Sequence, residues 1–391
     1  MLAMRGLATG LCAGCVVGLL RLSHDRAAAR VALWLEEWRE VWWTVPIWFG
    51  VLVALAVILR RIVREEPLIS GSGIPQTELA LAGRLSFTWW RVLLAKFLGS
   101  WLALFGGLAL GREGPSIQMG GAVGAGFHAL WRPAAPHALT GSPYVVAGAV
   151  AGLAAAFGAP AAGVLFAFEE MKSRRDTSLI VAACASAIGA HLMIRIVFGM
   201  GRILPFAGFE APPLSSFWIV ALEGAVFGVL GVGYNKTLLW LHDREAGQTL
   251  IPDRWRALPP LLLAGCLALF APLLIGGGES LIIFVGEHDV ALKTLILLLA
   301  FKYLFAQYST VASIPGGLLM PILCLGALWG RLWAELPVSA LAAHGLASGS
   351  VQPYVLFGMV SYFAATVRAP LTGIVLVTEM SGTYTCLPGS L

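Results

Sequence analysis

Residues 111–121 read Gly111-Arg112-Glu113-Gly114-Pro115-Ser-Ile-Gln-Met-Gly-Gly, and they stand directly between two long apolar segments. Glycines and a proline flank the charged pair Arg112 and Glu113, so the backbone is expected to break there. Charge and unwound backbone are both costly at membrane depth, where they occur buried in protein or along a watery path. The stretch therefore predicts a transmembrane chain in which Glu113 lies on an ion path.

The composition around this stretch is that of a polytopic membrane protein. Of 391 residues, 58% are hydrophobic and only 12% are charged, whereas a soluble domain carries about 25% charged residues. The net charge of +5 is modest, and in a membrane protein it indicates loop topology rather than a nucleic-acid partner. The cysteines and histidines show no metal-ligand spacing, so we predict no metal site and no cofactor.

The apolar segments predict helices, several of which are too short to span a bilayer. A spanning helix needs about 20 residues, and the segments at residues 143–157 and 161–168 are shorter. Short segments interrupted by glycine and proline are typical of transporters whose helices stop part-way across the membrane. The alternating pattern of a barrel strand is missing, so the predicted fold class is an all-α polytopic membrane protein.

Basic residues give an orientation, because cytoplasmic loops are enriched in lysine and arginine. Three basic clusters are expected to share the cytoplasmic side: Arg60, Arg61 and Arg64; Lys172, Arg174 and Arg175; and Arg244, Arg254 and Arg256.

The two halves of the chain resemble each other. The stretch from Ala159-Pro160 to Glu169 lines up with the stretch from Ala369-Pro370 to Glu379, with alanine, proline, glycine and glutamate matching at one constant offset. Four residues of the opening stretch match a second set at another constant offset, namely Gly111, Pro115, Gly120 and Gly124 with Gly317, Pro321, Gly326 and Gly330. We therefore predict a first membrane repeat at residues 1–200, a linker at 201–213 and a second repeat at 214–391.

Three stretches look like the starts of broken helices: Gly71-Ser72-Gly73-Ile74-Pro75-Gln76, Gly111 to Pro115, and Ser313-Ile314-Pro315-Gly316-Gly317-Leu318-Leu319-Met320-Pro321. Glycine lets the backbone turn, and proline suits the first turn of a helix. A helix N-terminus presents unpaired N–H groups and the positive end of the dipole. Several such ends that converge would bind an anion without trapping it beside a full positive charge.

Glu113 has a possible function beside such a site. When ionised it can occupy the anion position itself, and when protonated it would leave that position free, so one group could gate the path and carry a proton. The alternative is a structural ion pair with Arg112 or another basic group. Ser72 could donate its hydroxyl to the anion, or it could simply cap a helix. Glu169 and Glu170 are either solvated helix-end carboxylates or, in the case of Glu170, an interfacial proton relay.

Together these motifs resemble the chloride channel and transporter (CLC) family. The family pattern is GSGIP, then GREGP, then GGxFxP, with a repeat pair around APxxG…E. Here the first two motifs begin at Gly71 and Gly111, the third occupies residues 316–321, and the resemblance extends from about residue 5 to Met380.

The resemblance implies a homodimer in the lipid bilayer, in which each subunit has its own anion pathway within two inverted-topology repeats of tilted and broken helices. It implies that Ser72 coordinates chloride, with serine typical of chloride-preferring members. It also implies that Glu113 is the gate and external proton site, and that Glu170 is the internal proton site. The backbone at Gly73, Gly114, Leu318 and Leu319 completes the expected chloride site. The expected function is proton-coupled chloride exchange in a bacterial inner or plasma membrane.

Two features depart from the family pattern. Leu319 stands where the family usually has phenylalanine, which keeps the backbone N–H donors but changes the side chain lining the path. The sequence ends at Leu391 without the last helices of the family, one of which supplies an anion-coordinating tyrosine. Tyr384 lies too early to take that role, and part of the expected dimer interface is missing with those helices.

Three other functions remain open at this stage. A passive voltage- or proton-gated chloride channel would have the same fold, and a truncated member could be inactive. An intramembrane enzyme would use Glu113, or Glu169 and Glu170, as acid and base. The sequence offers no nucleophile–base arrangement and no metal ligands, so we expect that the protein is not an enzyme.

Overall fold

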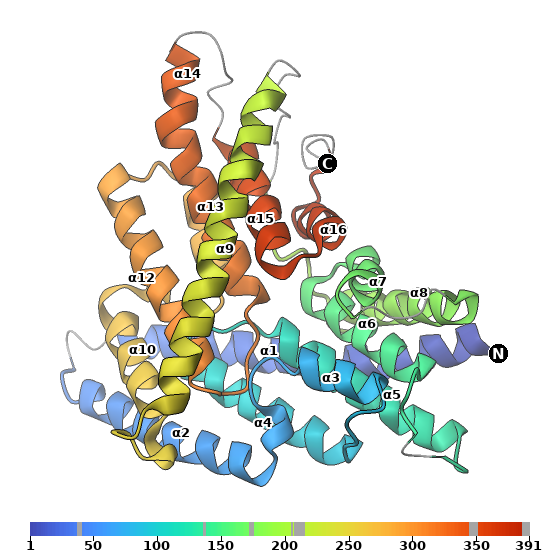
Figure 1. Cartoon of the computed structure of the whole chain (residues 1–391). Coiled ribbons are helices and arrows are strands. Elements are labelled where there is room, and N and C mark those ends of the chain that lie inside the picture. The colour runs from blue at the N-terminus through green and yellow to red at the C-terminus, as the bar shows by residue number, and fades with distance from the viewer. Residues whose placement is uncertain are drawn as a thin grey trace.

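The computed structural model describes residues 1–36, 41–135, 138–171, 176–204, 206, 216–343 and 351–384. Within these ranges the chain is helical and contains no β-strand (Figure 1). The α-helices are α1 (Leu2–Glu36), α2 (Thr44–Glu65), α3 (Ile74–Leu81), α4 (Trp89–Phe105), α5 (Glu113–Trp131), α6 (Pro143–Phe157), α7 (Pro160–Glu169), α8 (Thr177–Leu192), α9 (Phe217–Gly247), α10 (Leu258–Phe270), α11 (Glu279–Glu287), α12 (Leu292–Val311), α13 (Leu319–Trp333), α14 (Ser339–Ala343), α15 (Gln352–Val367) and α16 (Pro370–Ser381).

Helix length and hydropathy confirm the predicted all-α polytopic membrane fold. Six helical segments among the described residues are long and apolar enough to cross a membrane: Leu2–Leu33, Thr44–Glu65, Thr177–Val197, Phe217–Gly247, Leu292–Val311 and Leu319–Leu341. Others, including α6, α7 and α16, are apolar but too short to do so. The mixture of full and partial spans is the one that the interrupted apolar segments predicted.

The first helix extends further than the apolar segment at residues 7–20. Alanine-rich sequence follows that segment, and alanine has the strongest helix propensity. Helix α1 therefore continues past Arg21, His24 and Asp25 to Glu36. This extension carries polar side chains to the edge of a cavity described below.

Helices α7 and α16 make reciprocal contacts across the two halves of the chain. The Glu169 carboxylate at the end of α7 accepts hydrogen bonds from the N–H groups of Leu371 and Thr372 in the first turn of α16, at 3.0 and 2.7 Å. In return, the Glu379 carboxylate accepts from the N–H groups of Ala161 and Ala162 in α7, at 3.2 and 2.9 Å. The two helices lie side by side (Figure 1). Each donor and acceptor has its counterpart at one constant offset, which is the arrangement of a pseudo-two-fold axis.

Close helix crossings repeat in the same way. A Cβ on Gly120 of α5 would collide with the carbonyl oxygen of Gly148 in α6, and a Cβ on Gly326 of α13 would come within 2.6 Å of the carbonyl oxygen of Gly358 in α15. Small residues let membrane helices approach this closely, and van der Waals packing then holds them together. The α5–α6 pair and the α13–α15 pair are therefore equivalent parts of the two halves.

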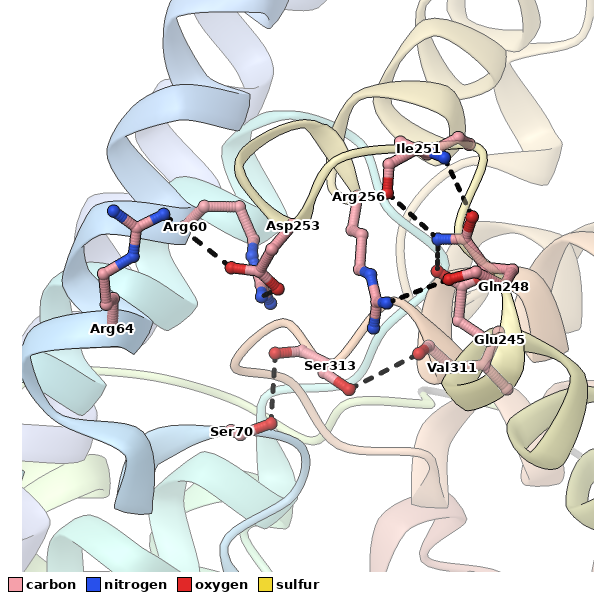
Figure 2. Close-up of polar contacts among 10 residues, drawn as sticks. All are labelled: Arg60, Arg64, Ser70, Glu245, Gln248, Ile251, Asp253, Arg256, Val311 and Ser313. Carbon is pink, nitrogen blue, oxygen red and sulfur yellow. Dashed lines mark hydrogen bonds and ion pairs between the residues drawn. The ribbon is translucent and has the colours of Figure 1, made fainter.

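Figure 2 shows where two of the three basic clusters lie. Arg60 and Arg64 of α2 form ion pairs with Asp253 in the loop between α9 and α10, the second at 3.8 Å. That loop carries Arg254 and Arg256, and Arg244 lies in the last turn of α9 just before it. These two clusters therefore lie near each other, and their place on the cytoplasmic side stays a prediction. The third cluster, Lys172, Arg174 and Arg175, lies outside the described residues. Most of the predicted linker at 201–213 also lies outside them, so the repeat boundary stays a prediction.

Candidate functional site

Helices α5 and α13 begin at equivalent positions on either side of a short backbone bridge. The N–H of Gly111 donates to the carbonyl of Gly317 at 2.6 Å, and the N–H of Gly317 donates to the carbonyl of Gly111 at 2.7 Å. The bridge is antiparallel, so the two equivalent segments run in opposite directions. Helix α5 then begins at Glu113 and α13 at Leu319. Two helix N-termini, with their unpaired N–H groups, therefore meet at one place.

The third broken-helix start joins the same place. The N–H of Gly316 donates to the carbonyl of Gly71 at 3.0 Å, and the Ser70 hydroxyl donates to the carbonyl of Ser313 at 3.1 Å (Figure 2). A Cβ on Gly114 would lie only 2.8 Å from the Cβ of Ser72. Ser72 thus packs against the first turn of α5, and the three stretches singled out in the sequence are neighbours in space.

The Ser72 hydroxyl retains a free donor in this arrangement. Its oxygen accepts a hydrogen bond from the N–H of Ile74 at 3.3 Å, which corresponds in part to the capping alternative. Because a hydroxyl both accepts and donates, its O–H can still point to an anion. Gly73 precedes α3 with φ of 87°, and Leu318 and Leu319 stand at the start of α13.

Two buried lysines hold the unwound backbone in place. Lys96 donates to the carbonyls of Ile69 and Gly71, at 2.8 and 2.7 Å. Lys302 donates to the carbonyls of Leu274 and Gly276, at 2.9 and 2.8 Å. Buried carbonyl groups without a hydrogen-bond donor are costly. Each lysine donates to two carbonyl groups that no helical hydrogen bond satisfies.

The Lys302 contact reveals a fourth broken-helix start that the sequence reasoning missed. Gly276-Gly277-Gly278 stands before α11, as Gly71-Ser72-Gly73 stands before α3, and Gly278 has φ of 102°. The repeat contained a signal for it, because Gly71 and Gly73 match Gly276 and Gly278 at one offset. Lys96 and Lys302 are also counterparts, although they are separated by one residue more than the two glycine pairs are.

Glu113 is folded back over its own motif and is fully buried. A Cβ on Gly111 would collide with Oε2 of Glu113, so only glycine leaves room for the carboxylate there. The backbone N–H groups of Glu113 itself and of Met320, in the first turn of α13, lie close to the carboxylate, although neither oxygen has a hydrogen bond of normal geometry among the described residues. Burial of a carboxyl group is costly, and an ionisable group inside a membrane protein is by default a candidate functional residue.

The ion-pair alternative for Glu113 is not found with Arg112. The Arg112 guanidinium instead pairs with Glu279 of α11 at 2.7 Å and with Asp25 of α1 at 3.1 Å. Among the described residues, no cation lies within ion-pair distance of Glu113. Neither Asp25 nor Glu279 stood out in the sequence, because each reaches Arg112 only through the tertiary fold.

A cavity leads to Glu113 from one side. It has a volume of about 760 Å³ and is lined by α1, α5, α11 and the surrounding turns, including His24, Asp25, Arg112, Glu113 and Glu279. We call it the Glu113 vestibule. Its wall combines apolar side chains with this cluster of charged ones, and the buried Glu113 carboxylate lies on that wall.

Glu170 lies elsewhere, on a second cavity of about 940 Å³. This cavity is also lined by Glu78, His128, Arg132 and Arg368, so its wall carries charges of both signs. Glu170 is half-buried at the end of α7. The structure thus brings Ser72, Gly73, Gly114, Glu113, Leu318 and Leu319 together and places Glu170 on a separate cavity.

The groups that meet at this site are of the kind that could bind an anion. Its donors are helix N-termini and a hydroxyl, and its titratable group is a single carboxyl. Among the described residues, no group of histidine, cysteine, aspartate or glutamate side chains could hold a metal ion. Tyr384 is exposed, and the expectation that it does not coordinate the anion stays a prediction.

Comparisons with known proteins bear on the family and the fold of the chain. Residues 49–391 match the sequence model of the family described as voltage gated chloride channel. The H(+)/Cl(-) exchange transporter ClcA of Vibrio campbellii is 35% identical over 384 residues, which cover 95% of this chain and 81% of that protein. ClcA of Klebsiella pneumoniae is 33% identical over 381 residues, covering 93% and 78%.

Solved structures show the same fold. A slow cyanobacterial Cl−/H+ antiporter superposes with a TM-score of 0.89 at 28% identity, covering 99% of this chain and 92% of that one. A eukaryotic CLC transporter superposes with a TM-score of 0.78 at 21% identity, covering 99% and 69%, and at that identity the likeness concerns the fold alone.

Proposed function

Because the chain belongs to the voltage gated chloride channel family, we propose that it exchanges chloride for protons across a bacterial inner or plasma membrane, with Glu113 as the gate. The observation that carries this proposal is the buried Glu113 carboxylate at the meeting point of three helix starts. The ClcA relatives are named as H(+)/Cl(-) exchange transporters, which agrees with it.

Chloride is proposed to bind where the helix N-termini converge. Ser72 supplies a hydroxyl donor, and the backbone at Gly73, Gly114, Leu318 and Leu319 supplies dipoles and N–H groups. Partial charges of this kind bind an anion favourably enough for entry and weakly enough for release. The replacement of phenylalanine by Leu319 leaves this backbone contribution intact.

Glu113 is proposed to alternate between two states. Ionised, its carboxylate occupies the anion position in front of the helix ends and closes the path. Protonated, it loses its attraction to those helix dipoles and can swing into the vestibule, which admits chloride. One proton is thus exchanged with the vestibule each time the gate opens and closes, and this step couples the two ions.

Glu170 is proposed as the proton site on the other side. It is a half-buried carboxylate on the wall of a separate, polar cavity, so it can exchange protons with water without using the chloride path. Assembly as a homodimer in the lipid bilayer, with one pathway in each subunit, is part of the same proposal and comes from the family resemblance.

The test is flux from liposomes containing the purified protein, with chloride and proton movement recorded together. A chloride gradient should drive protons uphill in the wild type. Glu170→Gln should abolish proton movement and leave chloride efflux, whereas Glu113→Ala should leave chloride efflux without proton coupling. Asp243→Asn changes an exposed carboxylate on α9 and serves as the control.

The same recordings separate the alternatives. Chloride efflux that drives no uphill proton movement in the wild type would indicate a passive channel, and no flux at all would indicate an inactive member. Unchanged coupling in Glu113→Ala would contradict the proposed gate. Chemical cross-linking in the liposomes tests the dimer, since a protein that remains monomeric at all lipid dilutions contradicts it.

A further inference from the structure

Arg112 joins three helices at the inner end of the Glu113 vestibule. Its side chain is only 6% exposed, and its two terminal nitrogens go to different carboxylates, Glu279 at 2.7 Å and Asp25 at 3.1 Å. These partners come from the first turn of α11 and from the extended part of α1. Both carboxylates line the vestibule, and Arg112 precedes Glu113 directly in the chain.

The charged and titratable groups that face this cluster are few. Besides Arg112, Glu113, Asp25 and Glu279, they are Arg21 and His24 on α1. Arg21 donates to the backbone carbonyl of Ala155 at 2.7 Å rather than to a carboxylate. The Arg112 charge is therefore neutralised mainly by Glu279 and Asp25.

The neutralisation of Arg112 by these carboxylates affects the ionisation of Glu113, the next residue in the chain. A buried guanidinium with no counter-charge would favour the ionised form of Glu113 and would also attract chloride in the vestibule. Two carboxylates on the guanidinium oppose both effects. Because charges interact strongly in a partly buried site, removing one of these two carboxylates should change the pH at which Glu113 is protonated.

We propose that Glu279 is a positioning residue for proton exchange: together with Asp25 it orients and neutralises Arg112, and thereby sets the pH range over which Glu113 takes up a proton from the vestibule. The inference rests on the proposed function and adds to it a determinant in the second half of the chain. Glu279 has no acidic counterpart in the first half, where Ile74 begins α3.

Glu279 should have the larger effect of the two carboxylates. Its bond to Arg112 is shorter, and its side chain is 35% exposed against 54% for Asp25. It also stands at the first position of α11, where the turn at Gly278 and the contact of Lys302 with Gly276 fix the backbone. Exposed ion pairs are screened by water and salt, so the less exposed pair should dominate.

The experiment measures chloride efflux from liposomes across a series of vestibule-side pH values for the wild type, Glu279→Gln and Asp25→Asn. Glu279→Gln removes a negative charge, so Glu113 should be protonated only at lower pH. The pH of half-maximal efflux should fall by about half a unit to one unit, a threefold to tenfold higher proton concentration. Asp25→Asn should give a smaller shift in the same direction, and Glu279→Asp, which keeps the charge, should restore the wild-type midpoint.

Glu287→Gln is the matched control, because it makes the same change at the exposed far end of α11; its midpoint should equal that of the wild type. A lower rate with an unshifted midpoint in Glu279→Gln would mean a merely structural role and would overturn the inference. If the Glu279→Gln variant does not fold, the Asp25→Asn variant provides the test. An unshifted pH midpoint of efflux in Asp25→Asn also overturns the inference.

Failure of the proposed function has a different signature. In that case the wild type drives no uphill protons, or Glu113→Gln leaves the pH dependence of efflux intact. The inference alone fails when the wild type is coupled, Glu113→Gln removes the pH dependence, and Glu279→Gln and Asp25→Asn leave the midpoint in place.

Discussion

The reciprocal contacts of α7 and α16 predict an unequal pair of stability losses. Replacing Glu169 by alanine removes three acceptor contacts, because its carboxylate also accepts from the Thr372 hydroxyl at 2.7 Å. Replacing Glu379 by alanine removes two, and these are longer. Each variant leaves the first N–H groups of the opposite helix without their acceptor.

The size of each loss follows from the number and charge of these hydrogen bonds. A hydrogen bond to a charged group contributes about 1.5–3 kcal/mol when buried, and loss of a helix N-terminal acceptor costs about 0.5–2 kcal/mol. Both carboxylates are half-buried, so water replaces part of what is lost. We expect about 2 kcal/mol for Glu169→Ala and about 1 kcal/mol for Glu379→Ala.

The thermal midpoint of unfolding in detergent, followed by tryptophan fluorescence, measures the difference. For a chain of 391 residues 1 kcal/mol corresponds to about 1 °C, so the expected drops are about 2 and 1 °C. Asp243→Ala, on the exposed face of α9, controls for the loss of a carboxylate and should leave the midpoint unchanged. Drops in the reverse order, or drops no larger than the control, would refute the reasoning from the reciprocal contacts.

Three further variants test the site and its frame. Gly111→Ala places a Cβ where Oε2 of Glu113 lies, so it should displace the carboxylate and make chloride efflux from liposomes less dependent on pH. Lys302→Met leaves the two backbone carbonyls that Lys302 holds without a donor. Each unsatisfied carbonyl should lower the free energy of unfolding by about 1–3 kcal/mol, and the thermal midpoint should fall accordingly. Glu223→Leu should raise the midpoint, because this buried carboxylate of α9 has no hydrogen-bond partner among the described residues and its removal ends a desolvation cost of about 1–3 kcal/mol.

Local chemistry explains what could be predicted from the sequence. Glycine allows the backbone to turn, and proline fixes φ at a value that suits the first turn of a helix. The helix starts near Ile74, Glu113 and Leu319 were therefore expected where the structure has them. The convergence of the three starts followed from the chemistry of an anion site together with the internal repeat. The functional roles of Glu113, Ser72 and Glu170 stay predictions.

What could not be predicted depends on tertiary contacts. Asp25 follows an apolar segment in sequence and looks like the beginning of a loop, but helix α1 continues and carries it to Arg112. Glu279 was missed because its segment is short and rich in glycine, and because the repeat, which matches the glycines before it, pairs Glu279 itself with Ile74. The partners of Lys96 are backbone carbonyls, which every residue carries, so no sequence pattern reveals them.

The two halves supply a nearly symmetric frame, and the chemistry of the site lies in the differences between them. Equivalent positions carry Glu113 and Leu319, on either side of the bridge between Gly111 and Gly317. Two carboxylates at these positions would face each other in a buried site, where like charges cannot both ionise. A single carboxylate avoids this repulsion and leaves the N-terminus of α13 free to attract an anion. Duplication can thus build the converging helix ends, and the gate that we propose depends on an acid in only one of the two halves.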